Sequence, residues 1–193
     1  MNAPSAPGPA VAGAMDHLAL CRIFDRVFLP TENTRLVHGG DEPVYLPADP
    51  HCPWHRVVFR HDYASSALHE VAHWCIAGSQ RRLLMDYGYW YSPDGRSTGR
   101  QAQFERVEAR PQALEWVFSR ACGIPFRPSI DNLDGAPADS HGFARSILCE
   151  AHQLCREGLP VRAGRFLSAL ADHSGLGREL HEADFRLDPA WLA

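Results

Sequence analysis

Apolar residues recur every three or four positions in five stretches of the chain, the spacing that is typical of helices with one buried face. The first stretch begins near Met15 and is expected to end at Pro30, because proline lacks the N–H that continues a helix. The second runs from Asp62, a candidate cap for its first turn, to Gly78. The third covers residues 101–118 and is expected to break or kink at Pro111. Two further stripes consist of Phe143, Ile147, Leu148, Ala151 and Leu154, and of Phe166, Leu167 and Leu170.

Three short stretches between the first two helical ones have the aliphatic and aromatic content of strands. They are residues 33–38, which Gly39 and Gly40 are expected to end, residues 44–46, and residues 56–60. The last of these leads almost directly into the helix predicted over 62–78, so that helix should be held rigidly at the edge of a sheet. Residues 87–91 are a candidate fourth strand, whose aromatic side chains either pack in the core or form the wall of a pocket.

Length and composition predict one ordinary domain. The chain has 193 residues, of which 45% are hydrophobic, enough for a proper core. Residues 1–14 are mostly alanine, proline and glycine, so we expect a disordered tail followed by a single domain over residues 15–193. The formal net charge is −4 and the sequence pI is about 6.2, so the chain lacks the basic field that dominates nucleic-acid binding. We therefore expect no nucleic-acid partner.

The six cysteines indicate a reducing compartment. None forms a Cys-x-x-Cys pair, and their scatter through apolar helical stretches is typical of buried free thiols. The N-terminal region lacks a signal-peptide pattern, and no stretch approaches 18 apolar residues. The sequence therefore predicts a cytoplasmic protein that makes no membrane contact.

The most informative motif is the His-Glu-x-x-His sequence of residues 69–73. His69 and His73 are one helical turn apart, so both imidazoles can reach one cation. Glu70 lies beside them and is a candidate general base or orienting group for a metal-bound water. The alternative is a surface helix with two stacked histidines and a solvated glutamate. The apolar residues that flank the motif argue against it, because unpaired polar groups there would be costly to bury.

A third ligand is expected from a carboxylate further along the chain, as in other sites built on two histidines. Glu105 and Glu108 are three residues apart on the third predicted helix, and we assign Glu108 as the ligand. The alternative is that both glutamates are solvated beside Arg106 and Arg110. Such a site suits either a zinc peptidase, in which Glu70 activates water, or a non-haem iron oxygenase, and the ligand types alone permit both.

Several longer strings resemble the bacterial elongation factor P hydroxylase family. They are residues 33–37, 41–48, 69–78, 88–96 and 111–114, so the resemblance is dense from about residue 33 to 132 and looser in the C-terminal third. It implies an α+β domain with helices packed round a small mixed sheet, similar to the fold of a metal-dependent endoribonuclease of rRNA maturation. The His-Glu-x-x-His helix would be central to that fold.

The resemblance also implies a reaction: hydroxylation of a lysine of elongation factor P after another enzyme has added a β-lysyl group. The cofactor would be Fe(II), with dioxygen as co-substrate, and elongation factor P carrying β-lysyl-lysine would be the partner. The implied metal ligands are His69, His73 and Glu108, with Glu105 as the substitute for Glu108. Glu70 would then handle protons near the metal.

Because the modified lysine carries ammonium groups, acidic and aromatic residues are candidates for binding it. Those residues are Asp41, Glu42, Tyr45, Trp90 and Asp94. Asp94 has a structural alternative, since Pro-Asp-Gly is a turn sequence. Two other functions remain open from the residues: a zinc-dependent peptidase, and a binding protein whose metal is structural.

Overall fold

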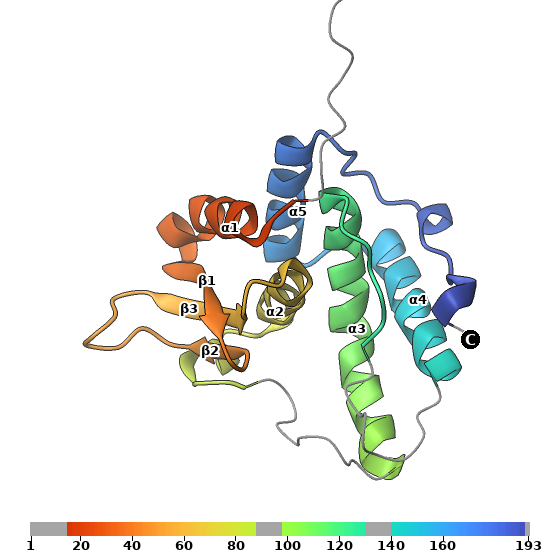
Figure 1. The fold of residues 1–193 in the computed structure, drawn as a ribbon, viewed down its shortest axis with the longest axis horizontal. Coiled ribbons are helices and arrows are strands. Elements are labelled where there is room, and N and C mark those ends of the chain that lie inside the picture. The colour runs from red at the N-terminus through yellow and green to blue at the C-terminus, as the bar shows by residue number, and fades with distance from the viewer. Residues whose placement is uncertain (1–14, 88–97, 130–139, 192–193) are drawn as a thin grey trace, which may run out of the picture.

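The computed structural model describes residues 15–87, 98–129 and 140–191. Its strands are β1 (Thr34–Gly40), β2 (Val44–Leu46) and β3 (His55–Arg60), which form one three-stranded sheet in the order β1-β3-β2 (Figure 1). The central strand β3 pairs parallel with β1 and antiparallel with β2. The sheet is therefore small and mixed, as expected. The predicted tail over residues 1–14 and most of the candidate strand 87–91 lie outside the described residues.

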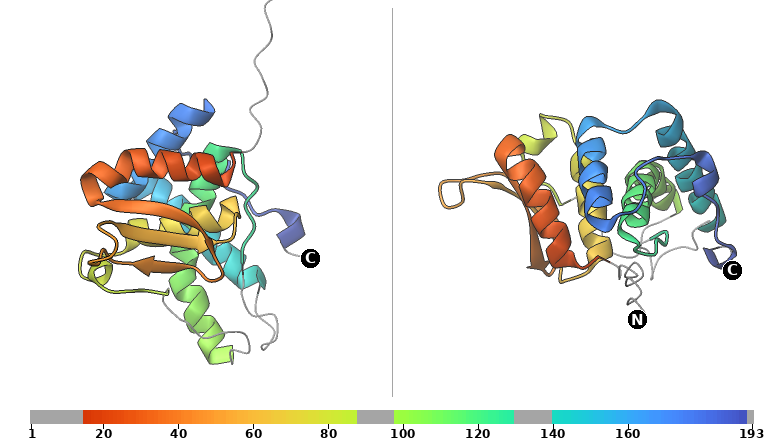
Figure 2. Two further views of the ribbon diagram at one scale, coloured as in Figure 1. Left: turned by 60° about the vertical axis from the view of Figure 1, so that its left-hand side comes forward. Right: turned by 90° about the horizontal axis from the view of Figure 1, so that it is seen from above.

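The described part of the chain also contains five α-helices. They are α1 (His17–Glu32), α2 (Ala64–Ile76), α3 (Thr98–Cys122), α4 (Ser140–Glu157) and α5 (Val161–Ser174), with three short 3₁₀ turns at Arg81–Leu83, Glu182–Asp184 and Pro189–Trp191. Helices α1 and α2 contact the sheet, and α2 also packs on α3 and α5. Helix α4 covers the side of α3 that is remote from the sheet (Figures 1 and 2). The result is a single α+β domain; its predicted likeness to the endoribonuclease fold stays a prediction.

An aromatic cluster joins α1, α2 and α5 at the centre of the domain. Phe24 and Phe28 contact each other and both contact Trp74 and Phe166, with ring centroids 4.7 to 6.2 Å apart and the rings edge to face or tilted. All four side chains are buried. One face of α2 packs against these rings, and another face of the same helix packs against α3.

Both helix-internal prolines are accommodated without ending a helix. Helix α1 continues through Pro30 to Glu32 and ends where Asn33 takes a left-handed conformation with φ 47°, so the predicted end at Pro30 is wrong. Near this end the carbonyl of Val27 also accepts hydrogen bonds from Thr31 Oγ1 and Arg165, which stabilise the last turn. Helix α3 is one element through Pro111, so it is not broken there.

Two further predictions, of where a strand ends and of which residue caps a helix, are wrong. Strand β1 includes both Gly39 and Gly40, with an irregular register between Val37 and Gly40 where Gly39 has φ 95°. Asp62 does not cap α2, because the cap position is Tyr63 and has no side-chain hydrogen bond. Asp62 is one residue too early in the chain for its carboxylate to serve as the cap.

The C-terminal end of α2 is held by Arg162 of α5. Its guanidinium donates hydrogen bonds to the carbonyls of Trp74, Cys75 and Ala77, and lies 4.8 Å from the centre of the Trp74 ring. A cation at this position donates hydrogen bonds to carbonyls that have no partner within the helix, and its charge interacts favourably with the negative end of the helix dipole. Arg162 thus fixes the helix that carries the His-Glu-x-x-His motif.

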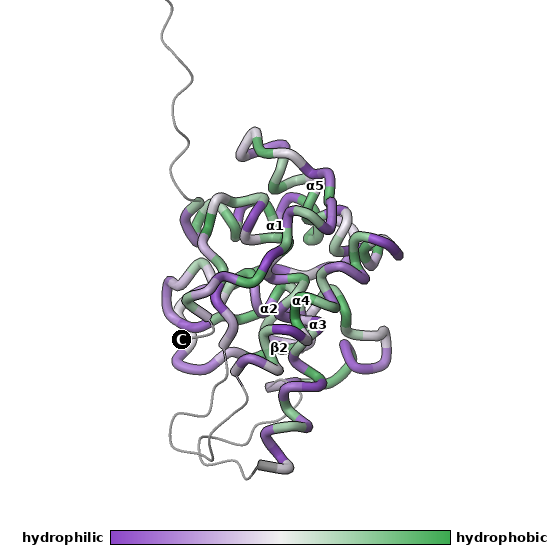
Figure 3. Tube along the Cα trace, turned by 90° about the vertical axis from the view of Figure 1, so that its right-hand side faces the viewer, coloured by the Kyte–Doolittle hydropathy of each residue, from purple (hydrophilic) through white to green (hydrophobic). Residues whose placement is uncertain are grey.

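Hydrophobic and hydrophilic residues alternate along the helices (Figure 3). In the described residues no helix has a stretch long and apolar enough to cross a membrane.

Candidate metal centre

Helix α2 presents the two histidines of the motif toward α3. Its residues Leu68, Val71 and Cys75 are buried in the core, which fixes the rotation of the helix. The side chains of His69 and His73 are 24% and 17% exposed, so they lie at the border between core and solvent. This half-buried position leaves one side of both imidazoles accessible.

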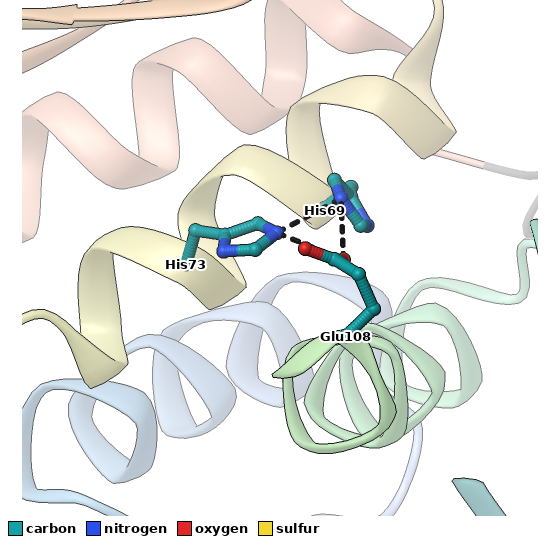
Figure 4. A group of neighbouring side chains, drawn as sticks. All are labelled: His69, His73 and Glu108. Atoms are coloured by element: carbon teal, nitrogen blue, oxygen red, sulfur yellow. Dashed lines mark hydrogen bonds and ion pairs between the residues drawn. The ribbon is translucent and has the colours of Figure 1, made fainter. Parts of the chain in front are cut away.

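Glu108 of α3 completes a group of three possible ligands (Figure 4). The Nε2 atoms of His69 and His73 are 3.0 Å apart, and Glu108 Oε2 lies 3.2 Å from His73 Nε2 and 3.6 Å from His69 Nε2. Two atoms that each lie about 2.0 to 2.2 Å from one ion are about 2.8 to 3.6 Å apart for angles from 90° to tetrahedral. The three atoms therefore fit one small divalent ion.

The burial of Glu108 argues that this grouping is more than a surface contact. Its side chain is 6% exposed, so the alternative of a solvated glutamate is wrong for this residue. Glu105, the substitute ligand, instead accepts a hydrogen bond from Gln101 one turn earlier on α3. Within the described residues only His69, His73 and Glu108 form such a group.

Glu115 is a residue of this site that the sequence analysis missed. Its Oε2 lies 2.9 Å from His69 Nδ1, and its side chain is 10% exposed. Although burial lowers the pKa of His69, the hydrogen bond that its Nδ1 donates to Glu115 and the negative charge of that carboxylate outweigh this effect and raise the pKa to about 10. A signal was present, because Glu108 and Glu115 are seven residues apart and so share one face of α3.

Glu70 and His73 both line a cavity next to the candidate metal centre. The cavity has a volume of about 40 Å³ and is lined by Tyr45, Val57, Glu70, His73, Trp74, Ala77, Arg81, Arg82 and Asp86. Burial raises the pKa of the Glu70 carboxyl. The two guanidinium groups in the lining have acidic partners, since Arg81 pairs with Asp86 and Arg82 with Glu32. The cavity thus joins aromatic walls to a carboxyl group beside a candidate metal ligand.

The structure brings one of the five candidate substrate-binding residues to this cavity. Tyr45 lines it, and its hydroxyl donates a hydrogen bond to the carbonyl of Arg82. Asp41 and Glu42 are exposed in the turn between β1 and β2 and are not among the residues that line the cavity. Trp90 and Asp94 lie outside the described residues.

Two imidazoles and one carboxylate, held on two packed helices beside a cavity, define a candidate mononuclear metal centre. Residues 23–185 match the elongation factor P hydroxylase family, and the chain belongs to that family. The chain is also 45% identical over 163 residues to the elongation factor P lysine hydroxylase of Haemophilus influenzae. That alignment covers 84% of this chain and 92% of the relative.

Proposed function

We propose that this protein is a non-haem, iron-dependent hydroxylase that acts on the β-lysylated lysine of elongation factor P. The observation that carries the proposal is the convergence of His69, His73 and Glu108 in a chain of the elongation factor P hydroxylase family. The H. influenzae relative is named for hydroxylation of a lysine of this factor. The reaction would take place in the cytoplasm, which agrees with the six free cysteines.

His69, His73 and Glu108 would hold the metal ion. A bound Fe(II) would supply the one-electron chemistry by which dioxygen is reduced, and two histidines with one carboxylate are the ligand set of such enzymes. One oxygen atom enters the carbon–hydrogen bond of the substrate and the other leaves as water. Each turnover therefore takes two electrons and two protons from an external two-electron reductant.

The cavity beside His73 is the proposed place for the end of the substrate side chain. A lysyl chain has an apolar stem and a cationic end, and the cavity offers aromatic walls from Tyr45 and Trp74. Both arginines of its lining are paired with acidic residues, which reduces their repulsion of an ammonium group. Glu70 lines the same cavity. It would accept either a proton or a hydrogen bond from the bound substrate.

The test is an intact-mass measurement on elongation factor P that carries β-lysyl-lysine. The protein is loaded with Fe(II) without oxygen, then mixed with the factor, ascorbate and air. The expected result is a gain of one oxygen atom by the factor. A parallel reaction with the unmodified factor tests whether the β-lysyl group is required, and no gain is expected there.

The control variants separate the site from the fold. His73→Ala should keep its circular dichroism spectrum and lose the gain in mass, because one ligand is removed from a half-buried position. Glu150→Gln on α4, which alters an ion pair with Arg110 of α3, should behave as the wild type. No gain of oxygen with wild-type protein shown to contain iron would overturn the proposal.

A further inference from the structure

Each ring nitrogen of His69 faces a glutamate of α3, and Nδ1 is hydrogen-bonded to one of them. Nδ1 lies 2.9 Å from Glu115 Oε2, and Nε2 lies 3.6 Å from Glu108 Oε2. The two glutamates are two helical turns apart on α3, so the spacing of one helix places one carboxylate at each end of the imidazole. His73 is held differently, because in the described part of the chain its Nδ1 has no hydrogen-bond partner.

Glu115 has no evident packing reason to be a carboxylate. It lies between buried neighbours on α3, and among the described residues His69 is its one hydrogen-bond partner. A buried ionic pair generally contributes no more stability than apolar side chains of similar volume. The charge at Glu115 is therefore better explained by an effect on His69 than by the stability of the core.

We propose that Glu115 is a positioning residue of the metal centre: it accepts a hydrogen bond from His69 Nδ1 and so directs the Nε2 lone pair toward the space shared with His73 and Glu108. This inference rests on the proposed function, since it takes His69 as a ligand. A carboxylate that accepts from the second ring nitrogen fixes the tautomer and ring orientation of a ligating histidine and makes it a stronger donor. Glu115 does not itself contact the ion or the substrate.

The first test measures metal affinity without any substrate. Dissociation constants for Co(II) and Zn(II) are compared for the wild type, Glu115→Gln, Glu115→Leu and the control Glu150→Gln. We expect a rise of about 10- to 100-fold in the Glu115 variants, larger for leucine than for glutamine, because the amide still offers an acceptor oxygen. The control, whose carboxylate pairs with Arg110, should bind as the wild type does.

The second test reads the tautomer of His69 directly. Long-range ¹H–¹⁵N spectra of the histidine rings in the zinc-loaded protein should show a proton on Nδ1 of His69 in the wild type. In Glu115→Leu that signal should be lost or broadened, while the melting temperature of the metal-free protein shows that the variant is folded. A role in packing alone would change the melting temperature and leave the ring signals and the metal affinity as they were.

The outcomes separate this inference from the proposed function. Wild-type affinity and unchanged ring signals in both Glu115 variants would overturn the positioning role and leave the metal centre intact. A wild-type protein that binds neither metal would overturn the metal centre itself, and the inference with it. Weaker binding in Glu115→Gln and still weaker binding in Glu115→Leu, with an unaffected Glu150→Gln, would support the inference.

Discussion

At the scale of single residues, the assignment of the third ligand depends on which carboxylate of α3 faces α2. Glu108 Oε2 is 3.2 Å from His73 Nε2, whereas Glu105 is bonded to Gln101. We therefore predict that Glu108→Gln loses most of its bound metal, while Glu105→Gln retains it. Metal content after dialysis, measured by mass spectrometry of the element, checks this prediction.

The same two variants can also contradict the assignment of Glu108 as the ligand. Full retention of metal by Glu108→Gln together with loss by Glu105→Gln would move the ligand to Glu105. Both variants change a carboxylate to an amide of the same size, so packing is preserved in each. A difference between them therefore reports on ligation.

The sequence predicted the part of the site that is local. His69, Glu70 and His73 are within five residues of one another, so their arrangement follows from the helical repeat alone. That Glu108 lies beside the two histidines agrees with the expected position of a third carboxylate, and its role as a ligand stays a prediction. Glu115 was missed because it is 46 residues from its partner, and its role depends on which face of α3 packs against α2.

At the scale of elements, α2 is positioned from its C-terminal end by Arg162. This guanidinium donates hydrogen bonds to the carbonyls of Trp74 and Cys75 in the last turn and to that of Ala77, the residue that follows the helix. We predict that Arg162→Met lowers the free energy of unfolding by about 2 to 3 kcal/mol, because hydrogen bonds to a charged group are worth about 1.5 to 3 kcal/mol. Urea unfolding of the metal-free protein measures this change.

The matched control for Arg162 is Arg156→Met. Arg156 pairs with Glu182 at an exposed position, where an ion pair contributes about 0 to 1 kcal/mol. Equal losses in the two variants would show that the contacts with the end of α2 carry no special weight.

The elements themselves were largely predicted, and their ends were not. All five helices and all three strands in the described residues correspond to stretches recognised from the hydrophobic pattern. The errors were at Pro30, Asp62 and Gly39. At these positions the end of the helix or strand depends on contacts with residues distant in the sequence or on the backbone conformation. Near Pro30, for example, Arg165 of α5 supports the last turn of α1, and no local pattern shows that contact.

At the scale of the whole molecule, the titratable groups of the candidate metal centre couple folding to pH. In the metal-free protein the pKa of His69 is raised from 6.5 to about 10, although burial acts in the opposite direction, because Glu115 and Glu108 favour the charged imidazole. The folded state then binds more protons than the unfolded state between these two values. Stability from this group is complete below about pH 6.5 and is lost as the pH rises toward 10.

We therefore predict that the free energy of unfolding of the metal-free protein falls between pH 6.5 and 10. Burial also raises the pKa of Glu70, which acts in the same direction and begins at lower pH. Urea unfolding at a series of pH values measures the slope, and Glu115→Gln should make it shallower. A slope that is equal in wild type and variant would contradict the assigned cause.

The arrangement of the whole domain places the centre between two layers. The sheet and the aromatic cluster support α2 from one side, and α3, itself packed against α4 and α5, brings Glu108 and Glu115 from the other. Figure 1 shows α2 between the sheet and α3. Only the packing of these layers joins residues that are about 40 positions apart in the chain.

The most direct test of the account is a crystal structure of the Fe(II)-loaded protein, with anomalous diffraction collected on both sides of the iron absorption edge. The account predicts one strong iron peak within bonding distance of His69 Nε2, His73 Nε2 and Glu108 Oε2, with Glu115 hydrogen-bonded to His69 Nδ1. An iron peak bound by other residues, or no peak in crystals shown to contain iron, would contradict it.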